Sequence, residues 1–507
     1  MDVSYELVNS LNSEEEKLLK KYLINNSKGA IESKKYIQLF DLLRSEKKVS
    51  QEQIIRKIYG SGKEKDKSSI NAQRQLRLRL NEKIEAFVLQ QSYKEDAELH
   101  VLKFISMAKS MYRKKHFELT WHYLRKAEQL AKNIEQYELS ARIFTLQIQY
   151  SWIPNAPDIE NLFEKRNSNL LLAKKERDII GAMALIHQQI MKARTLAVNF
   201  DIDVIIGDVL KRFNLEEEIK GNNSFSPSLS MIVGSILHEK KDYITLEKYY
   251  VSIYKEMERS QKFDRHNRDY KIKLLELISW ATLKNRKYQE SEKYLEIGKR
   301  EQQQHNLQTF SNVPLILTSV SLYLCTGRYE KAQQMLEELK SSDEFKLSKF
   351  NLYHYYLYMN LAAIHIIQED YTKALQCLIP IKRGEKLYIQ QSGIEGAFKK
   401  HMLECILHFE TGDYEYVNYR FKAQERKFRA YLADPAHIRE KTFSSLLINI
   451  NKNPDLLKES NFISKVNKLI SMKPIEPGDT EFISFNAWLK AKMENRKYYD
   501  VFLEMVR

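Results

Sequence analysis

The chain has 507 residues, of which 43% are hydrophobic and 29% are charged, and its formal net charge at pH 7 is +15. This balance is typical of a folded soluble protein and excludes a chain that is disordered throughout. Only 14 glycines and 9 prolines occur, and the abundant Leu, Lys, Glu and Gln favour helix, so we expect an all-α protein.

The N-terminal sequence and the cysteines indicate a cytoplasmic protein. MDVSYELVNSLNSEEEKLLKKYL has neither the basic nor the apolar region of a signal peptide. No stretch approaches the ~18 apolar residues that span a bilayer, so we expect no membrane insertion. Cys325, Cys377 and Cys405 fit neither a disulfide framework nor a metal-ligand set, and we expect them to be reduced thiols.

Residues 1–95 are expected to form a helical domain. Apolar periodicity predicts helices over KYIQLFDLL, VSQEQIIRKIYG and INAQRQLRLRLNEKIEAFVLQ, and Ser50 is the expected N-cap of the second. Four apolar residues share one face of the third helix: Leu76, Leu80, Ile84 and Phe87.

Positive charge is concentrated between Arg44 and Lys83, where 12 lysines and arginines stand against 5 acidic residues. The order of helices, basic loop and arginine-rich helix resembles winged-helix DNA-binding domains of the response-regulator type over about 60 residues. The resemblance implies that nucleic acid binds through residues 44–83. The candidate contacts are Lys63, Lys65, Lys67, Arg74, Arg77 and Arg79. The other interpretation is a small helical cap that covers the open end of the helices that follow.

A short phrase recurs further along the chain. TGRYEKA (326–332), QEDYTKA (368–374) and ETGDYEYV (410–417) each carry an aromatic residue at the same place. The aligned aromatic residues of the whole chain are Phe117, Tyr243, Tyr288, Tyr329, Tyr371 and Tyr414. The last five are separated by 45, 41, 42 and 43 residues, and a steady period of this size is typical of stacked helix pairs.

Other positions keep the same register. The side chains nine residues before the aromatic residue and three residues after it are mostly small, as Ala362 and Ala374 are around Tyr371. The side chain seven residues after the aromatic residue is large and apolar, as Leu378 is. Small residues let two antiparallel helices pack closely, and the large ones fill the space against the next pair. We expect the aromatic residue to begin the second helix of each pair, after a turn supplied by Gly327 or Gly412.

Residues 358–381, YMNLAAIHIIQEDYTKALQCLIPI, resemble a tetratricopeptide repeat (TPR). The residues at the eight signature positions of that family are Tyr358, Leu361, Ala362, His365, Tyr371, Ala374, Leu378 and Ile381, with His365 in place of an aromatic residue. The period of about 42 residues exceeds the 34 of the family, so longer helices or connections must absorb the difference. The resemblance, which extends over about 100–430, implies a right-handed solenoid of antiparallel helix pairs.

The sequence therefore divides into four expected parts. A first helical-repeat segment (96–219) follows the N-terminal domain, a TPR-like array covers 225–430, and a helical cap covers 431–507. The loop KGNNSFSPS at 220–228 is the clearest internal boundary. Four residues near the C-terminus are expected to seal the last repeat: Trp488, Leu489, Met493 and Tyr498.

In TPR arrays the first helix of each pair lines a concave groove that binds peptides. The resemblance places seven residues on this face: Tyr356, Met359, Asn360, Ile366, Lys399, Met402 and Phe409. Tyr and Met suit a peptide groove because they make adaptable apolar contacts. The other interpretation is that these side chains pack between repeats.

No motif for catalysis, for a metal or for a cofactor stands out. GSGK at 60–63 has Lys57 and Glu64 where a phosphate-binding loop needs Gly and Ser or Thr, and the 12 histidines show no ligand spacing. We expect a non-enzymatic cytoplasmic scaffold that binds a protein or peptide segment in its groove. The alternative is a transcriptional or nucleic-acid-linked regulator whose basic N-terminal module is controlled by the repeats.

Overall fold

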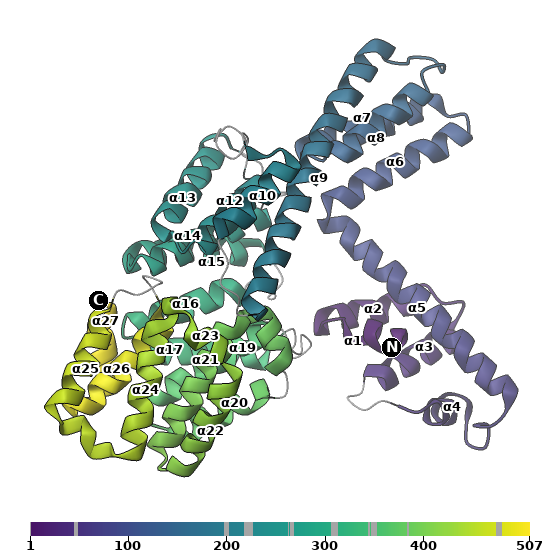
Figure 1. Cartoon of the computed structure of the whole chain (residues 1–507). Coiled ribbons are helices and arrows are strands. Elements are labelled where there is room, and N and C mark those ends of the chain that lie inside the picture. The colour runs from purple at the N-terminus through teal and green to yellow at the C-terminus, as the bar shows by residue number, and fades with distance from the viewer. Residues whose placement is uncertain are drawn as a thin grey trace. The chain divides into compact units, whose positions relative to one another are not determined.

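The structure is a computed structural model that describes residues 2–44, 49–196, 202–216, 227–261, 263, 268–305, 313–342, 345, 352–382, 385–472 and 479–507. Every regular element in these ranges is a helix, and they contain no strand, which confirms the all-α expectation (Figure 1). The chain divides into two compact units, Met1–Lys174 and Lys175–Arg507. Most of the expected boundary loop at 220–228 lies outside the described residues.

The first unit begins with a group of helices that share one apolar core. In chain order the helices of this unit are α1 (Val3–Asn9), α2 (Ser13–Asn25), α3 (Ala30–Arg44), α4 (Gln51–Tyr59), α5 (Lys67–Glu95), α6 (Ala97–Arg113), α7 (Phe117–Asn133), α8 (Tyr137–Gln149) and the start of α9 (Ile159–Leu196), which crosses into the second unit. The apolar face expected on α5 is buried against α1–α4 through Leu76, Leu80, Ile84 and Phe87. Ser50 caps α4 in a capping box with Gln53, as expected.

Helices α6, α7 and α8 of the first unit pack around a second apolar core. Trp121 of α7 is fully buried there, and its Nε1 donates to the carbonyl of Pro154 at 2.9 Å. That hydrogen bond satisfies the only polar atom of a large apolar side chain. It also ties the turn after α8 back onto α7, so the proline-containing segment at 154–157 closes this group of helices.

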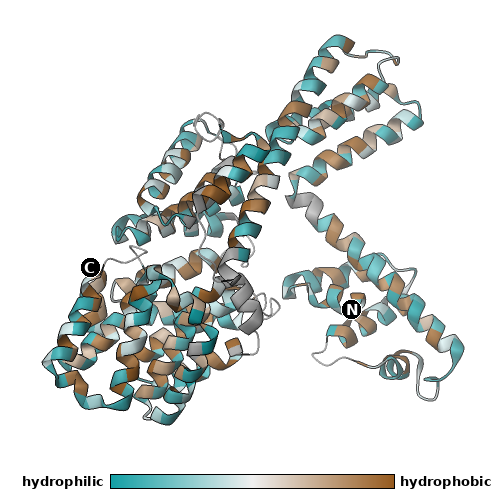
Figure 2. Cartoon of the chain, viewed as in Figure 1, coloured by the Kyte–Doolittle hydropathy of each residue, from teal (hydrophilic) through white to brown (hydrophobic). Residues whose placement is uncertain are grey.

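The second unit holds the remaining helices. In chain order they are the end of α9, α10 (Ile202–Phe213), α12 (Pro227–Glu239), α13 (Tyr243–Arg259), α14 (Arg268–Lys284), α15 (Tyr288–His305), α16 (Val313–Cys325), α17 (Tyr329–Ser341), α19 (Leu352–Ile367), α20 (Tyr371–Lys382), α21 (Glu385–Glu410), α22 (Tyr414–Lys427), α23 (Arg429–Ala433), the 3-10 turn Pro435–His437, α24 (Ile438–Lys452), the 3-10 turn Pro454–Lys458, α25 (Ser460–Ser471), α26 (Thr480–Glu494) and α27 (Tyr498–Val506). Neighbours in sequence pack as pairs. Brown and teal residues alternate along these helices in Figure 2, as amphipathic helices require.

The recurring phrase corresponds to one kind of turn. All six aligned aromatic residues are the first residues of helices, as expected, and Tyr137 begins α8 in the same way. The residue two positions earlier has a left-handed backbone in all seven cases: Lys115, Glu135, Lys241, Arg286, Gly327, Glu369 and Gly412. The next residue donates its N–H to the carbonyl five positions back, as Asp413 does to His408 at 2.9 Å. This is the Schellman ending of a helix, and only two of the seven turns use glycine for it.

Small residues lie where paired helices cross, as expected. In the α14–α15 pair, Ser279 and Ser291 are fully buried and their hydroxyl oxygens are 3.0 Å apart. In the α12–α13 pair, a Cβ atom on Gly234 would stand 1.7 Å from the hydroxyl oxygen of Tyr250. Any larger residue at Gly234 would therefore push the two helices apart.

The C-terminal helices reach much earlier pairs of the second unit. Trp488 of α26 donates to the carboxylate of Glu410, the last residue of α21, at 2.6 Å. Helix α27 buries Val501, Phe502 and Val506 in one cluster with Cys325 at the end of α16. Tyr288, the first residue of α15, donates to the carbonyl of Val506 at 2.6 Å. Residues 480–506 thus contact the turns of several pairs instead of only the last one.

Two further properties of the described residues bear on function. None of the helices in the part of the chain that the structure describes is long and apolar enough to cross a membrane. Cys325 and Cys405 are buried and Cys377 is half-buried. Burial raises the pKa of the Cys325 and Cys405 thiols to about 12, so neither is a thiolate at neutral pH.

Candidate binding cavity

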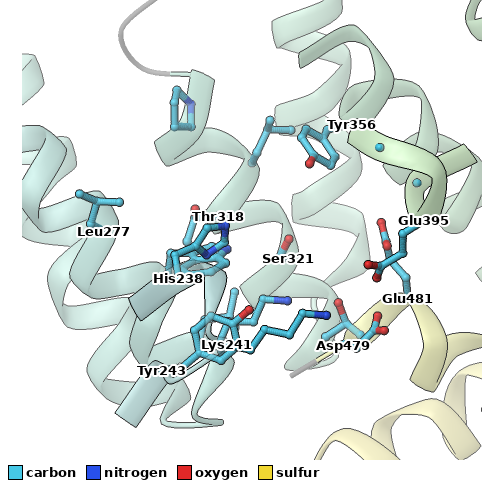
Figure 3. Close-up of a pocket in the computed structure, with 18 of the residues that line it drawn as sticks. His238, Lys241, Tyr243, Leu277, Thr318, Ser321, Tyr356, Glu395, Asp479 and Glu481 are labelled. Atoms are coloured by element: carbon cyan, nitrogen blue, oxygen red, sulfur yellow. The ribbon is translucent and has the colours of Figure 1, made fainter. Parts of the chain in front are cut away.

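A cavity of about 860 Å³ lies within the second unit (Figure 3). Its lining comes from helices that are far apart in sequence: α12–α14, α16, α19, and the chain from α21 to the start of α26. This volume is within the range of about 300–1,000 Å³ typical of ligand pockets. The side chains that Figure 3 labels converge on the cavity from opposite sides, with Ser321 of α16 between them.

One side of the cavity, which we call the acidic wall, consists of Glu395, Lys399, Asp479 and Glu481. The Lys399 ammonium nitrogen lies 2.9 Å from the Glu395 carboxylate, 3.1 Å from Asp479 and 3.1 Å from Glu481. Three carboxylates thus surround one ammonium group. The Lys399 and Asp479 side chains are buried, while those of Glu395 and Glu481 are partly exposed.

Local backbone features place these four side chains. Helix α21 bends at Gly393, where φ is +73°, and Glu395 and Lys399 follow one turn apart on the continuing helix. Asp479 is the N-cap of α26, and its Oδ1 accepts the Phe482 N–H at 3.1 Å. Glu481 is in the first turn of α26, where a negative charge is favoured by the helix dipole.

Tyr431 of α23 lines the cavity beside this wall. It is 4% exposed, and its hydroxyl has no hydrogen-bond partner among the described residues. Burial raises the pKa of Tyr431 well above its ordinary value, and the nearby Glu395 and Glu440 carboxylates raise it further. The ring of His437 stacks on that of Tyr431 at 3.9 Å. A buried hydroxyl without a partner is costly, because its desolvation is not offset by a new hydrogen bond.

The opposite side of the cavity, which we call the aromatic wall, comes from α12–α14. The Trp280 ring is 4.8 Å from that of His238 and 5.0 Å from that of Tyr243, both edge-on. The Lys284 ammonium lies 5.6 Å from the Trp280 ring centre, within cation–π range. Figure 3 shows Lys241 extending across the cavity toward Asp479.

The structure divides the seven predicted groove residues into two sets. Tyr356, Asn360 and Lys399 line the cavity. The other four are buried in the apolar core formed mainly by α19–α26: Met359, Ile366, Met402 and Phe409. The side chains of that second set pack against protein, as the packing interpretation expects, and Met402 is fully buried. The amide of Asn360 donates to the carbonyl of Tyr356 in its own helix at 2.8 Å.

Behind the acidic wall, α21 carries charged side chains into the protein interior. Lys400 donates to the Glu404 carboxylate at 2.7 Å, and Arg420 of α22 also contacts Glu404. His401 is buried beside them. Burial, reinforced by the positive charge of Arg420, lowers the pKa of His401 to about 3. This histidine is therefore neutral in the folded protein at neutral pH.

The basic residues of the first unit lie on its surface. Lys63, Lys65, Lys67, Arg74 and Arg79 are exposed, on the 60–66 turn and on α5. Arg77 is partly buried and pairs with Asp2 at 2.6 Å. Residues 45–48, inside the predicted basic segment, lie outside the described residues. The described part of the segment thus has a charged outer face.

Sequence reasoning did not find most residues of the cavity. Glu395, Tyr431, Asp479, Glu481 and Trp280 belong to segments that no motif connects. One local signal was present, because aspartate before a turn or an apolar run is typical of an N-cap. It identifies Asp479 as a cap, but it does not indicate what the cap faces. Among the described residues no group of His, Cys, Asp and Glu is arranged to hold a metal ion.

Comparison with other proteins identifies no relative of this chain. No protein-family model, curated protein or solved structure matches the chain. The cavity and the basic surface of α5 are therefore interpreted from the chemistry of this chain alone.

Proposed function

We propose that the chain is a non-enzymatic scaffold that binds a peptide, or a segment of another protein, in the cavity of its second unit. The observation that carries the proposal is the convergence of aromatic and charged side chains from distant helices on one cavity of about 860 Å³. Aromatic side chains supply apolar contact area, and charged groups of both signs orient a polar backbone. A peptide segment offers both kinds of partner.

The proposal includes the architecture that the sequence suggests. Helices that begin at Tyr243, Tyr288, Tyr329, Tyr371 and Tyr414 support a TPR-like array with a period of about 42 residues, and we propose that it winds as a right-handed solenoid. The inner helices of such an array present side chains toward a common axis. Of the predicted groove residues, the cavity retains Tyr356 and Asn360 of α19 and Lys399 of α21.

We also propose that the protein works in the cytoplasm without a cofactor. The three cysteines form no disulfide in the structure, and this supports a reducing compartment. The high pKa of the buried Cys325 and Cys405 thiols, about 12, argues against cysteine nucleophiles at these two positions.

A selection from random decapeptides tests the proposal. We expect peptides selected on the full chain to quench Trp280 fluorescence, because Trp280 lines the cavity, and to lose binding to the Ser321→Trp variant, whose new side chain fills the cavity. Ser460→Trp, at an exposed position on α25, is the matched control and should bind normally. Failure to select any peptide, or equal binding to both variants, would contradict the proposal.

The alternative function is a nucleic-acid-linked regulator. The exposed Lys63, Lys65, Lys67, Arg74 and Arg79 favour it, because such residues neutralise phosphates. In that case the full chain should be retained on duplex DNA with a steep salt dependence, and peptide binding to the second unit should change that retention.

A further inference from the structure

The acidic wall has more negative charge than its own lysine balances. Among its four side chains, Glu395, Asp479 and Glu481 each carry a carboxylate and Lys399 alone carries an ammonium group, with all three separations at or below 3.1 Å. Among these four side chains the carboxylates therefore outnumber the ammonium groups by two, and Lys241 extends toward them from the opposite side of the cavity. Because Asp479 is buried, its charge is screened less than that of a surface carboxylate.

The hydroxyl of Tyr431 provides an independent observation at the same wall. It is buried, it belongs to the cavity lining, and it has no hydrogen-bond partner among the described residues. A tyrosine hydroxyl can both donate and accept a hydrogen bond. Because this oxygen is closed off from solvent, a group with several N–H donors would reach it after a small shift of the lining, and it would then approach the carboxylates together.

A further carboxyl group, that of Glu440, lies near Tyr431. Glu440, buried on α24, keeps one carboxylate oxygen without a hydrogen-bond partner among the described residues. Burial raises the pKa of Glu440, and the Glu395 carboxylate raises it further. Lys241 extends toward Asp479 from the opposite side of the cavity. The chain thus already directs an ammonium group of its own toward the acidic wall.

We propose that the acidic wall and the Tyr431 hydroxyl form a subsite for a cationic group of the ligand, an ammonium or guanidinium from a lysine or arginine side chain. This inference depends on the proposed peptide-binding function and specifies the chemistry of the peptide. The planar guanidinium has five N–H donors and the ammonium has three. Either group can therefore donate to two carboxylates and to the tyrosine oxygen at once, which a neutral side chain of the same shape cannot do equally well.

Matched peptide pools test this subsite directly. The probes are N-acetylated, C-amidated decapeptide pools with one fixed central residue: arginine, its uncharged isostere citrulline, lysine or N6-acetyllysine. Binding to the full chain is measured by calorimetry at low and moderate salt. We expect the arginine and lysine pools to bind about tenfold more tightly than their neutral counterparts, because a charge-assisted hydrogen bond contributes enough for that ratio. The preference should shrink as salt is added.

Variants of this chain test whether the preference for charged peptides arises at the acidic wall. Glu481→Gln and Glu395→Gln remove charge from partly exposed side chains and should each reduce the ratio several-fold. Tyr431→Phe removes a hydroxyl that has no partner, so it should leave the melting temperature unchanged or higher and still weaken cation binding. Glu459→Gln, an exposed N-cap with no side-chain cap hydrogen bond, is the control and should preserve the ratio.

The outcomes separate this inference from the function on which it depends. Equal binding of charged and neutral pools would leave peptide binding intact and overturn the cationic subsite. A charge preference that survives in Glu481→Gln and Tyr431→Phe would also overturn it, because the cation would then bind elsewhere. If no pool binds the wild-type chain, the proposed function and this inference both fail.

Discussion

The basic segment of the first unit and the cavity of the second show two ways in which charge is arranged in one chain. In the first unit, Lys63, Lys65 and Lys67 are close in sequence and point outward from a turn and a helix start. In the second, Glu395, Lys399 and Asp479 come from two helices and meet within 3.1 Å. Charge that is clustered along a sequence is visible before folding. Charge that is brought together by folding is partly buried, and for that reason it can select a ligand.

The largest expected effect tests how far the second unit depends on distant contacts. Deleting residues 498–507 removes α27, whose Val501, Phe502 and Val506 are buried. Each such side chain stabilises the fold by about 1.5–3 kcal/mol. We expect the second unit to melt at a much lower temperature, and Cys325 to react with a thiol reagent that does not reach it in the intact protein.

The first unit is the internal control for this deletion. Trp121 and Trp152 both belong to it. In a background with Trp280 and Trp488 replaced by Phe, the fluorescence melt of the first unit should not change when α27 is removed. An equal fall in the melting temperatures of both units would show that they do not melt independently. The prediction that only the second unit depends on α27 would then be wrong.

The second prediction separates the core from the cavity lining. Met402→Ala empties a fully buried position and should cost about 2–5 kcal/mol, as should Leu378→Ala in the same cluster. Tyr356→Ala changes a half-buried side chain of the cavity and should cost less while weakening peptide binding. Chemical denaturation of the three variants is the measurement. If Tyr356→Ala is as destabilising as Leu378→Ala, its main role is packing.

The third prediction concerns acid. Since the pKa of His401 is about 3 in the folded protein and about 6.5 when unfolded, the unfolded state takes up this proton first. Stability from neutral His401 is therefore present above pH 6.5 and is lost as the pH falls toward 3. Because one pKa unit corresponds to about 1.4 kcal/mol, we expect a loss of roughly 4 kcal/mol from this group by pH 3. His401→Phe should make the melting temperature less sensitive to pH in that window, and an unchanged pH profile would refute the assignment.

The smallest effect belongs to the basic surface. Arg74 is exposed, whereas Arg77 pairs with Asp2 at 2.6 Å. If phosphates contact this face, Arg74→Ala should lower the slope of log affinity against log salt on duplex DNA by about 1. Arg77→Ala, one turn away on α5, should change it less, because Arg77 must give up Asp2 to contact a phosphate. Replacing Arg74, Arg77 and Arg79 together should abolish retention, and unchanged retention would favour the capping interpretation.

The sequence predicts local elements of this protein better than it predicts the site. The aromatic residue after each turn, the N-cap at Ser50 and the apolar face of α5 follow from rules that act over a few residues, and the structure confirms each one. The left-handed turn residues Lys115, Lys241 and Arg286 were not predicted, because the usual signal for this conformation is glycine. The helix ending imposes that conformation on them instead.

The cavity could be predicted only in part, for a geometric reason. Placing Tyr356 and Asn360 on an inner helix requires only the helical period and the family resemblance. Placing Met402 in the core instead of the groove requires knowing that α21 is covered on its other side by α24 and α26. The pairing of Lys399 with Asp479 spans 80 residues, and no periodicity in the sequence encodes a contact over that distance.

The return of α27 to the turns of earlier helices also sets an order of events during synthesis. The hydrogen bond from Tyr288 to Val506 spans 218 residues. At the usual rate of about 5–20 residues per second, a ribosome needs roughly 10–40 seconds to make that stretch. From the synthesis of Cys325 until that of α27, which is most of this interval, the apolar surface around Cys325 has no cover from α27. The helix pairs that contact α27 cannot complete their packing when they leave the ribosome, because α27 is made much later. Until then the nascent chain exposes an apolar surface that a chaperone could bind.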